Sequence, residues 1–408
     1  MSASCLVIRV LARPRRGILE GRRAGRRPGS PPCAVRRTMV AMTRSRVAAV
    51  LIGVVLLLAG ALLRAEAVAP GAAAPEMRPE VGVQFHGMWE DTTDAQRALF
   101  LDQLAEAGAM WVRLDVSWAM LQPDGPDRYD LAWGVPFVDR VISMITQRGL
   151  RPLVTLWLTP GWANGDAGER TLPDDPADYA RAAQWAAQRW QEQVPAWEVW
   201  NEPNSPDFMT SADPAEYATL LRAAYPAIKA GSPDATVVFG GTQLNDVDWI
   251  ARAYDAGVQG SFDALATHPY MSPADLPPEA PNDGTGDRFR HLVAVRDLMV
   301  ERGDEDLPVW LTEFGWSAHA NTGDEEPWQR GVTRDGQADY LLRTVRLVRE
   351  DMPYVTHMFW YTDRDRPDSG PHLGGYGLFD PELAPKPAFE ALEQYLSRRG
   401  AQEETAAG

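Results

Sequence analysis

The stretch AWEVWNEPN, residues 196–204, is a short apolar run that ends abruptly in polar residues. The stretch VWLTEFGW, residues 309–316, is built in the same way. Short, largely apolar runs of this kind are typical of strands buried on both faces of a parallel sheet. Each stretch therefore predicts a buried strand with polar side chains at its carboxyl end.

Similar runs recur along the chain and alternate with longer segments of helical period. We count eight strand-and-helix pairs, and eight is the number that closes a barrel. The sequence predicts an α/β fold, a (β/α)₈ or TIM barrel forming a single catalytic domain. The predicted strands are 81–86, 110–116, 151–158, 196–201, 236–241, 264–268, 309–314 and 356–361.

An open doubly wound sheet is the alternative α/β architecture. It would carry a glycine-rich phosphate loop after the first strand, but Phe85-His86-Gly87 occupies that place. The barrel is therefore preferred. Long loops at 159–175, 269–286 and 315–333 follow the third, sixth and seventh predicted strands, so we expect them to wall a cleft on one face.

Charge is distributed unevenly along the 408 residues. The first 79 residues hold 14 of the 40 basic residues and 3 of the 56 acidic ones, which leaves a charge of −27 on the remainder. So acidic a body repels phosphate backbones and anionic membrane surfaces, which argues against a nucleic-acid partner. A neutral, oppositely charged or polar substrate is favoured.

Residues 47–63 form an uninterrupted apolar stretch that follows Arg44 and Arg46 and precedes Ala65-Glu66-Ala67, the layout of a secretory signal. Cleaved signal and retained membrane anchor remain alternatives. Either predicts a protein that is secreted or anchored on the extracellular face of the membrane. We expect a disordered or mis-assigned extension at 1–38, this export segment and a linker at 39–79, the barrel at 80–398 and a flexible tail at 399–408.

Cys5 and Cys33 are the two cysteines of the chain, and both precede the apolar stretch. The exported body would have no thiol, which removes disulfides, cysteine-ligated zinc and cysteine nucleophiles together. The six histidines are scattered singly, whereas a metal-dependent hydrolase needs several converging ligands. We therefore predict no metal and no cofactor.

Two carboxylates end strands of the predicted barrel, Glu202 on the fourth strand and Glu313 on the seventh. Functional groups of such barrels gather at the carboxyl ends of the strands, so both should lie at one mouth. Hydrolysis of a glycosidic bond needs one carboxylic acid to protonate the leaving oxygen and a second carboxylate to attack or to activate water. The pair therefore predicts a glycosidase.

The segments WNEPN at 200–204 and TEFGW at 312–316 resemble the strand-four and strand-seven motifs of clan A glycoside hydrolases, of the cellulase-like family 5 and xylosidase-like family 39 type. The resemblance spans about residues 80–398. It implies a retaining enzyme that cleaves β-glycosidic bonds by double displacement, with Glu202 as acid/base and Glu313 as nucleophile.

The same resemblance assigns further residues to substrate binding. Arg113 would hold the nucleophile ionised, Asn201 would bind the sugar 2-hydroxyl, and either His268 or Tyr270 would touch the nucleophile. Trp360 would form the floor beneath the sugar ring, and His86 would follow strand one. Trp162 and Trp316 lie in strand-end loops, where flat aromatic faces suit pyranose rings.

Glu198 lies within the fourth predicted strand, and we expect it to point away from the mouth as an ordinary ion-pair partner. Aromatic loops on an exported protein suggest a polysaccharide substrate cut internally. An exo-acting β-glycosidase on small glycosides and a non-catalytic carbohydrate-binding barrel are the alternatives, and no motif selects the sugar or the linkage.

Overall fold

The computed structural model of the chain describes residues 78–407. The predicted extension and export segment therefore lie outside the described residues. Within the described part, no helix combines the length and the apolar character needed to cross a membrane.

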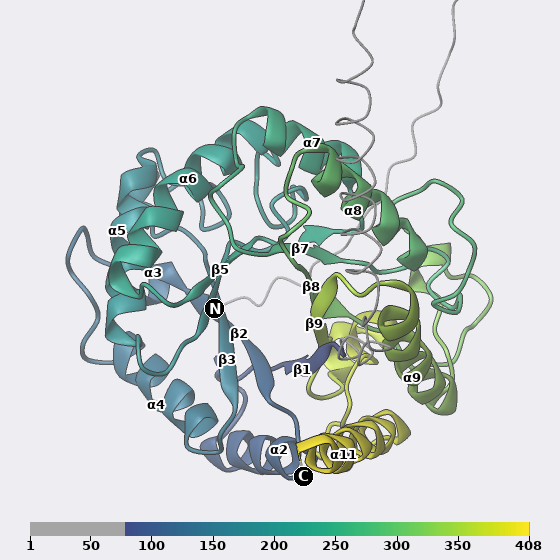
Figure 1. Ribbon diagram of the computed structural model, residues 1–408. Helices are drawn as coiled ribbons and strands as arrows, with labels where there is room; N and C mark the ends of the chain where they lie inside the picture. Colours follow the sequence, from purple (N-terminus) through teal and green to yellow (C-terminus); the bar gives the residue numbers. More distant parts are fainter. Residues whose placement is uncertain (1–77, 408) are drawn as a thin grey trace, which may run out of the picture. The chain divides into compact units, whose positions relative to one another are not determined.

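The described strands form one parallel sheet in the order β5-β4-β3-β2-β1-β9-β8-β7-β6. β6 follows β5 after two glycines and continues its line, so the two count as one barrel strand. β6 pairs with β7, and Val238 of β5 bridges Ala264 just before β7, so the sheet closes into an eight-stranded barrel. The predicted barrel is confirmed (Figure 1). The strands are β1 Glu80–Gln84, β2 Trp111–Ser117, β3 Arg151–Trp157, β4 Ala196–Val199, β5 Thr236–Phe239, β6 Thr242–Gln243, β7 Leu265–His268, β8 Val309–Phe314 and β9 Val355–Trp360.

Helices ring the barrel on its outside (Figure 1). Side-chain caps set where several of them begin: Asp213 accepts from Ala215 N at the start of α6, and Thr93 and Gln96 form a capping box on α2. The α-helices are α2 Asp94–Glu106, α3 Trp118–Leu121, α4 Gly134–Thr146, α5 Pro176–Arg189, α6 Pro214–Gly231, α7 Val247–Asp255, α8 Leu292–Glu301, α9 Arg334–Asp351, α10 Pro371–Gly374 and α11 Pro387–Ala407; the 3-10 helices are η1 Gly161–Ala163, η2 Phe289–His291, η3 Pro327–Gln329 and η4 Pro367–Ser369.

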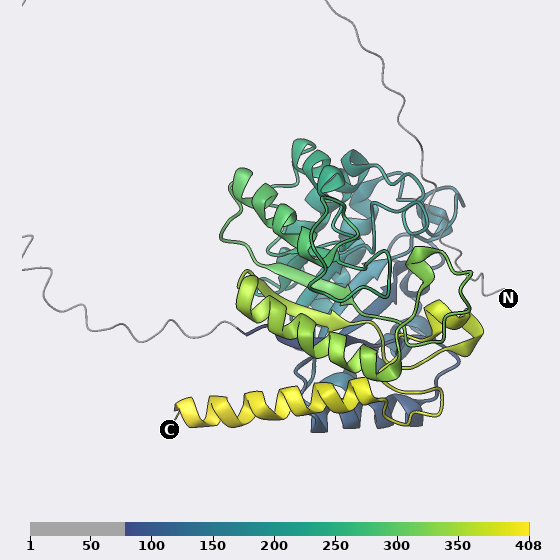
Figure 2. The same cartoon turned by 90° about the vertical axis from the view of Figure 1, so that its right-hand side faces the viewer.

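The last helix runs past the predicted end of the barrel domain. α11 packs along α9 and continues to Ala407 (Figure 2), so residues 399–407 of the predicted flexible tail have helical backbone, while their flexibility stays a prediction. The sequence after Gly400 is rich in Ala, Gln and Glu, which are good helix formers, and it extends a helix that is already anchored.

The interior of the barrel is arranged in layers, because alternate residues of every strand point inward. The lower layer is apolar and buried, and it forms a floor. Above it lies a polar layer, from which the strand ends lead to the mouth. The floor comprises Trp111, Leu153, Ala196, Val238, Ala264, Ala266, Trp310 and Phe359, and the polar layer comprises Gln84, Arg113, Thr155, Glu198, His268 and Thr312.

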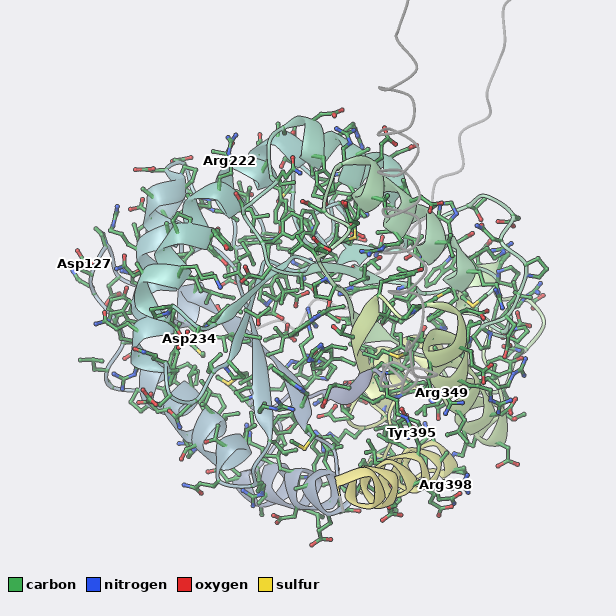
Figure 3. All side chains as sticks on the ribbon, viewed as in Figure 1. Asp127, Arg222, Asp234, Arg349, Tyr395 and Arg398 are labelled. Atoms are coloured by element: carbon green, nitrogen blue, oxygen red, sulfur yellow. The ribbon has the colours of Figure 1, made fainter. Side chains whose placement is uncertain are left out.

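Charged side chains on the outside of the barrel lie in solvent, unlike those inside it. Figure 3 places Asp127, Arg222 and Arg398 at the outer edge of the ring, and all three are exposed. Inside the barrel, by contrast, the charged Arg113 and Glu198 are fully buried and paired with each other. Burying charged side chains is costly unless they are paired and hydrogen-bonded. The presence of such a buried pair suggests that the polar layer has a function beyond stabilising the fold.

Candidate active site

Glu202 stands just beyond the carboxyl end of β4. Trp200 and Glu202 both have left-handed backbone, with φ of 72° and 42°, a conformation that non-glycine residues adopt rarely. This tight turn brings the Glu202 side chain to the mouth, where it is 4% exposed. Its Oε1 lies 2.8 Å from Nδ1 of His268, and its Oε2 accepts from Gln243 Nε2 at 3.1 Å.

Glu313 occupies the end of β8, where the register with β9 shifts between Leu311 and Phe314. Such irregularities re-aim side chains next to active sites, and here both Thr312 and Glu313 face the barrel interior. Arg113 Nη1 donates to Glu313 Oε1 at 2.7 Å, and the hydroxyl of Tyr270 donates to Oε2 at 2.8 Å.

The two carboxyls are adjacent. One oxygen of Glu202, one of Glu313 and a ring nitrogen of His268 all lie within 4.8 Å of one another. In residues 78–407 this trio is the one group of acidic and imidazole ligands close enough to hold a metal ion. Glu313 already accepts hydrogen bonds from Arg113 and Tyr270. These contacts suit a carboxylate that is held in place for a reaction.

The environment separates the pKa values of the two carboxyls. Burial and the charge of Glu313 raise the pKa of Glu202 well above its usual range. Burial also raises the pKa of Glu313, but Arg113 and the hydrogen bond from Tyr270 oppose that rise. Glu313 therefore ionises first, while Glu202 keeps its proton. Burial, together with the Arg113 charge, lowers the pKa of His268, so this imidazole is neutral.

Arg113 links the strand segments that carry the two carboxyls. Besides Glu313 it donates to Asn201 Oδ1 at 2.8 Å, to Gln84 Oε1 at 2.7 Å and to Glu198 Oε2 at 2.7 Å. Glu198 is the expected ion-pair partner, but its predicted direction was wrong. It points into the barrel, because it shares the inward face of β4 with the floor residue Ala196.

Two tryptophans predicted to touch sugar are buried in the core instead. Trp360 is fully buried, donates to Tyr376 O and packs on Phe314. Trp316 is 3% exposed and donates to Leu276 O. Inward-pointing residues of β9 alternate, so Phe359 and Tyr361 share the interior face while Trp360 points outward.

Tyr361, and not Trp360, faces the interior of the barrel. Its ring centroid lies 5.6 Å from that of His86 and 6.3 Å from that of Tyr270, beside Glu313. His86 is held there by Thr362 Oγ1 at 2.8 Å and by Asp363. Of the two candidates for the nucleophile contact, Tyr270 makes the hydrogen bond, and His268 pairs with Glu202.

Trp162 is half-buried, with its indole N–H donating to Gln122 O and its ring edge-on to Trp118. Sequence reasoning missed Thr312, Gln243 and Tyr361. Two of them could have been found from the sequence, since Thr312 directly precedes Glu313 and Tyr361 directly follows Trp360. Gln243 adjoins no predicted site residue in the sequence.

A barrel with two adjacent carboxyls of different pKa at its mouth has the arrangement that glycoside hydrolysis requires. The family model described as cellulase (glycosyl hydrolase family 5) matches residues 76–361, and the chain belongs to this family. The clan A resemblance is thereby confirmed, as is the assignment to the glycosidases at the level of the family.

The individual proteins that the chain resembles share only about a quarter of its residues or fewer. The chain is 26% identical over 311 residues to a β-xylosidase of Caldicellulosiruptor saccharolyticus, an alignment that covers 69% of this chain and 59% of that protein. The chain thus spans about three fifths of that relative. A family 39 glycoside hydrolase from Bacteroides cellulosilyticus WH2 has the same fold, with a TM-score of 0.62, 24% identity and coverage of 79% and 64% of the two chains. An exo-β-1,4-mannosidase from an Opitutaceae bacterium has a TM-score of 0.56 at 21% identity, covering 80% of this chain and 60% of its own.

Proposed function

We propose that the chain is a retaining β-glycosidase in which Glu313 attacks the anomeric carbon and Glu202 acts first as acid and then as base. The separation of the carboxyls carries this proposal, because oxygens of Glu202 and Glu313 lie within 4.8 Å of each other. Direct attack requires carboxyls about 5 to 5.5 Å apart, whereas an inverting enzyme needs about 6.5 to 9.5 Å to admit a water.

The protonation states suit this sequence of steps. Glu313 begins ionised beside Arg113 and forms the covalent glycosyl-enzyme, while Glu202 gives its proton to the departing oxygen. Loss of the Glu313 charge then removes one of the causes of the raised pKa of Glu202. Glu202 is thereby prepared to take a proton from the water that releases the sugar.

Neighbouring side chains would position the sugar ring. Arg113 occupies the Asn201 Oδ1 acceptor, so the Nδ2 hydrogens of Asn201 are oriented away from it as donors for the 2-hydroxyl. We assign the floor beneath the ring to Tyr361, whose place beside Glu313 and on the inward face of β9 supports this role. A neutral glycan suits the strongly acidic body.

Two kinds of substrate are candidates, a polysaccharide that is cut internally and a short glycoside that is cut from its end. A polysaccharide cut internally was expected from aromatic residues in the loops, but Trp316 is buried; Trp89, in the loop after β1, is 41% exposed beside His86. Exo-action on a short β-linked glycoside is the second candidate, favoured by relatives named β-xylosidase and exo-β-1,4-mannosidase. Chromatography of early products from xylan and mannan separates them: a ladder of oligosaccharides supports internal cutting, and monosaccharide alone supports exo-action.

The stereochemical test uses an aryl β-xyloside or β-mannoside and NMR of the first-formed sugar. The β-anomer is expected, because two inversions give net retention. An α-anomer as the first product would contradict the role of Glu313 as nucleophile.

Chemical rescue separates the two carboxyls. Glu202→Ala should spare the first step for activated aryl glycosides, because a good leaving group needs no acid, and azide should restore turnover with a β-glycosyl azide as product. Glu313→Ala should lose turnover by several orders of magnitude, and azide should yield only the α-azide. The same azide anomer from both variants would refute the assignment of the two roles.

A further inference from the structure

Glu198, in the polar layer below the mouth, is surrounded by hydrogen-bond donors. Its Oε1 accepts from Thr312 Oγ1 at 2.7 Å and from the Gly241 amide at 3.1 Å. Its Oε2 accepts from Arg113 Nε at 2.7 Å and from Thr155 Oγ1 at 2.5 Å. A carboxylate paired with an arginine only accepts, so the hydroxyl hydrogen of Thr312 must point to Glu198.

This direction decides the tautomer of His268. Thr312 Oγ1 lies 3.0 Å from His268 Nε2, and its single hydrogen is already directed to Glu198. Thr312 must therefore accept, and Nε2 must carry the hydrogen. Because His268 is fully buried and neutral, its other nitrogen, Nδ1, is left with a bare lone pair.

The bare nitrogen faces the acid/base residue. Nδ1 of His268 lies 2.8 Å from Glu202 Oε1, a separation that requires a hydrogen between them. Since Nδ1 carries none, the hydrogen belongs to Glu202. Gln243 Nε2 donates to the other oxygen, Oε2, which accordingly acts as an acceptor.

We propose that, in the substrate-free chain, Glu198, Thr312 and His268 form a hydrogen-bond relay that holds the acidic proton of Glu202 on Oε1, from which the O–H turns away from Nδ1 to the departing oxygen when it donates. The proposal rests on the proposed function only for the acid/base role of Glu202. The three are positioning residues, since they act through Glu202. When Glu202 is ionised, its Oε1 and Nδ1 oppose lone pair to lone pair, so the relay disfavours the ionised form.

Gly241 provides the space that the relay needs. A Cβ at this position would lie 2.3 Å from His268 Nε2 and 2.5 Å from Thr312 Oγ1, so only glycine admits their contact. The other charged or titratable groups around the relay are Glu313 on β8, Arg113 on β2, Asp207 after β4, Tyr270 after β7, Tyr179 on α5 and Tyr217 on α6.

Thr312→Val tests the relay, because it removes the acceptor of Nε2 while keeping the shape of the side chain. His268 is then free to carry its hydrogen on Nδ1 and to donate it to ionised Glu202. The basic limb of the kcat/KM profile, which reports Glu202, should move to lower pH by about one unit. The acid limb, which reports Glu313, should stay, and Thr312→Ser should restore the basic limb.

Thr155→Val is the matched control. It removes an equivalent buried donor to Glu198 from the neighbouring β3 but leaves the hydrogen bond from His268 Nε2 to Thr312 Oγ1 intact. Its basic limb should coincide with that of the unmodified chain. An equal shift in both valine variants, or no shift in Thr312→Val, would overturn the relay.

Nitrogen-15 NMR of the substrate-free, histidine-labelled full chain gives a readout that is independent of activity. Six histidines give few signals, and His268→Gln identifies those of His268. The relay predicts hydrogen on Nε2 and a bare Nδ1; hydrogen on Nδ1 would refute it. If Nε2 carries the hydrogen but no β-glycoside is hydrolysed, the proposed function fails and the assignment of the tautomer stands.

Discussion

The carboxyl of Glu202 hydrogen-bonds to two neutral groups among the described residues, His268 and Gln243, whereas Glu313 contacts the charged Arg113. In the mechanism that we propose, this asymmetry separates an acid from a nucleophile within one buried pair. Activity should fall on the acid side as Glu313 takes up a proton and on the alkaline side as Glu202 loses its own. Because burial raises both pKa values, both limbs should lie above the usual carboxyl range.

The raised pKa that suits Glu202 to act as an acid should also make the folded protein less stable at high pH. The folded-state pKa of Glu202 is raised above its unfolded value, so the native state is disfavoured progressively as pH rises from the unfolded value through the folded one. Glu202→Gln removes that penalty, and its amide nitrogen can donate to His268 Nδ1 while its oxygen accepts from Gln243. We expect the free energy of unfolding to rise by about 1–3 kcal/mol at pH 8 and to match the unmodified chain near pH 4.

Denaturant unfolding across this pH range measures the effect. Glu313→Gln is the comparison: the pKa of Glu313 is raised less, because Arg113 and Tyr270 oppose the rise, so this variant should gain less stability at pH 8 than Glu202→Gln. A Glu202→Gln variant less stable than the unmodified chain at pH 8 would contradict the prediction.

At the scale of single elements, the sequence predicts the strands well and side-chain directions less well. The eight barrel strands appear where apolar runs predicted them, because burial on both faces leaves a strong pattern. Tyr361 was missed because the family resemblance directed attention to its neighbour Trp360. The alternation of β9 alone, counted from the inward Phe359, selects Tyr361.

Other features depend on contacts that no local pattern contains. The register shift that turns both Thr312 and Glu313 inward arises where β8 pairs with β9, far along the chain. The inward direction of Glu198 makes sense only once Arg113 lies opposite on β2. A buried charge inside a predicted strand was the available signal, since such a position is costly unless it is paired.

Lys386 ties down the loop that follows β9 and carries Tyr361. It is 1% exposed, and its Nζ donates to Asp365 Oδ1 at 2.8 Å and to Gly375 O at 3.2 Å. Lys386→Met should lower the free energy of unfolding by about 3–5 kcal/mol, because Asp365 would remain largely buried without its partner.

Urea unfolding provides the measurement, and Arg302→Met provides the comparison. The pair of half-buried Arg302 and exposed Asp255 reaches solvent, so its loss should change stability by about 1 kcal/mol or less. A similar loss in both variants would show that Lys386 does not anchor the loop.

At the scale of the whole molecule, the barrel and the residues before it differ in charge and in cysteine content. Export remains our proposal, since residues 47–63 lie outside the described part of the chain. Cell fractionation should recover the protein outside the cytoplasm, because a basic flank followed by an apolar run is what the export machinery reads. Recovery solely from the cytosol with an intact amino terminus would refute the proposal.

The apolar floor of the barrel has a consequence for the order of events. Trp111, Trp310 and Phe359 are buried beneath the polar layer, so they close the lower end of the barrel to solvent. The departing alcohol and the incoming water must then share a single doorway at the mouth. In the retaining mechanism that we propose, water reaches the glycosyl-enzyme only after the alcohol has left the mouth, and an alcohol that remains there competes with water as the acceptor. That mechanism would therefore allow the sugar to be transferred to another alcohol when alcohols are abundant.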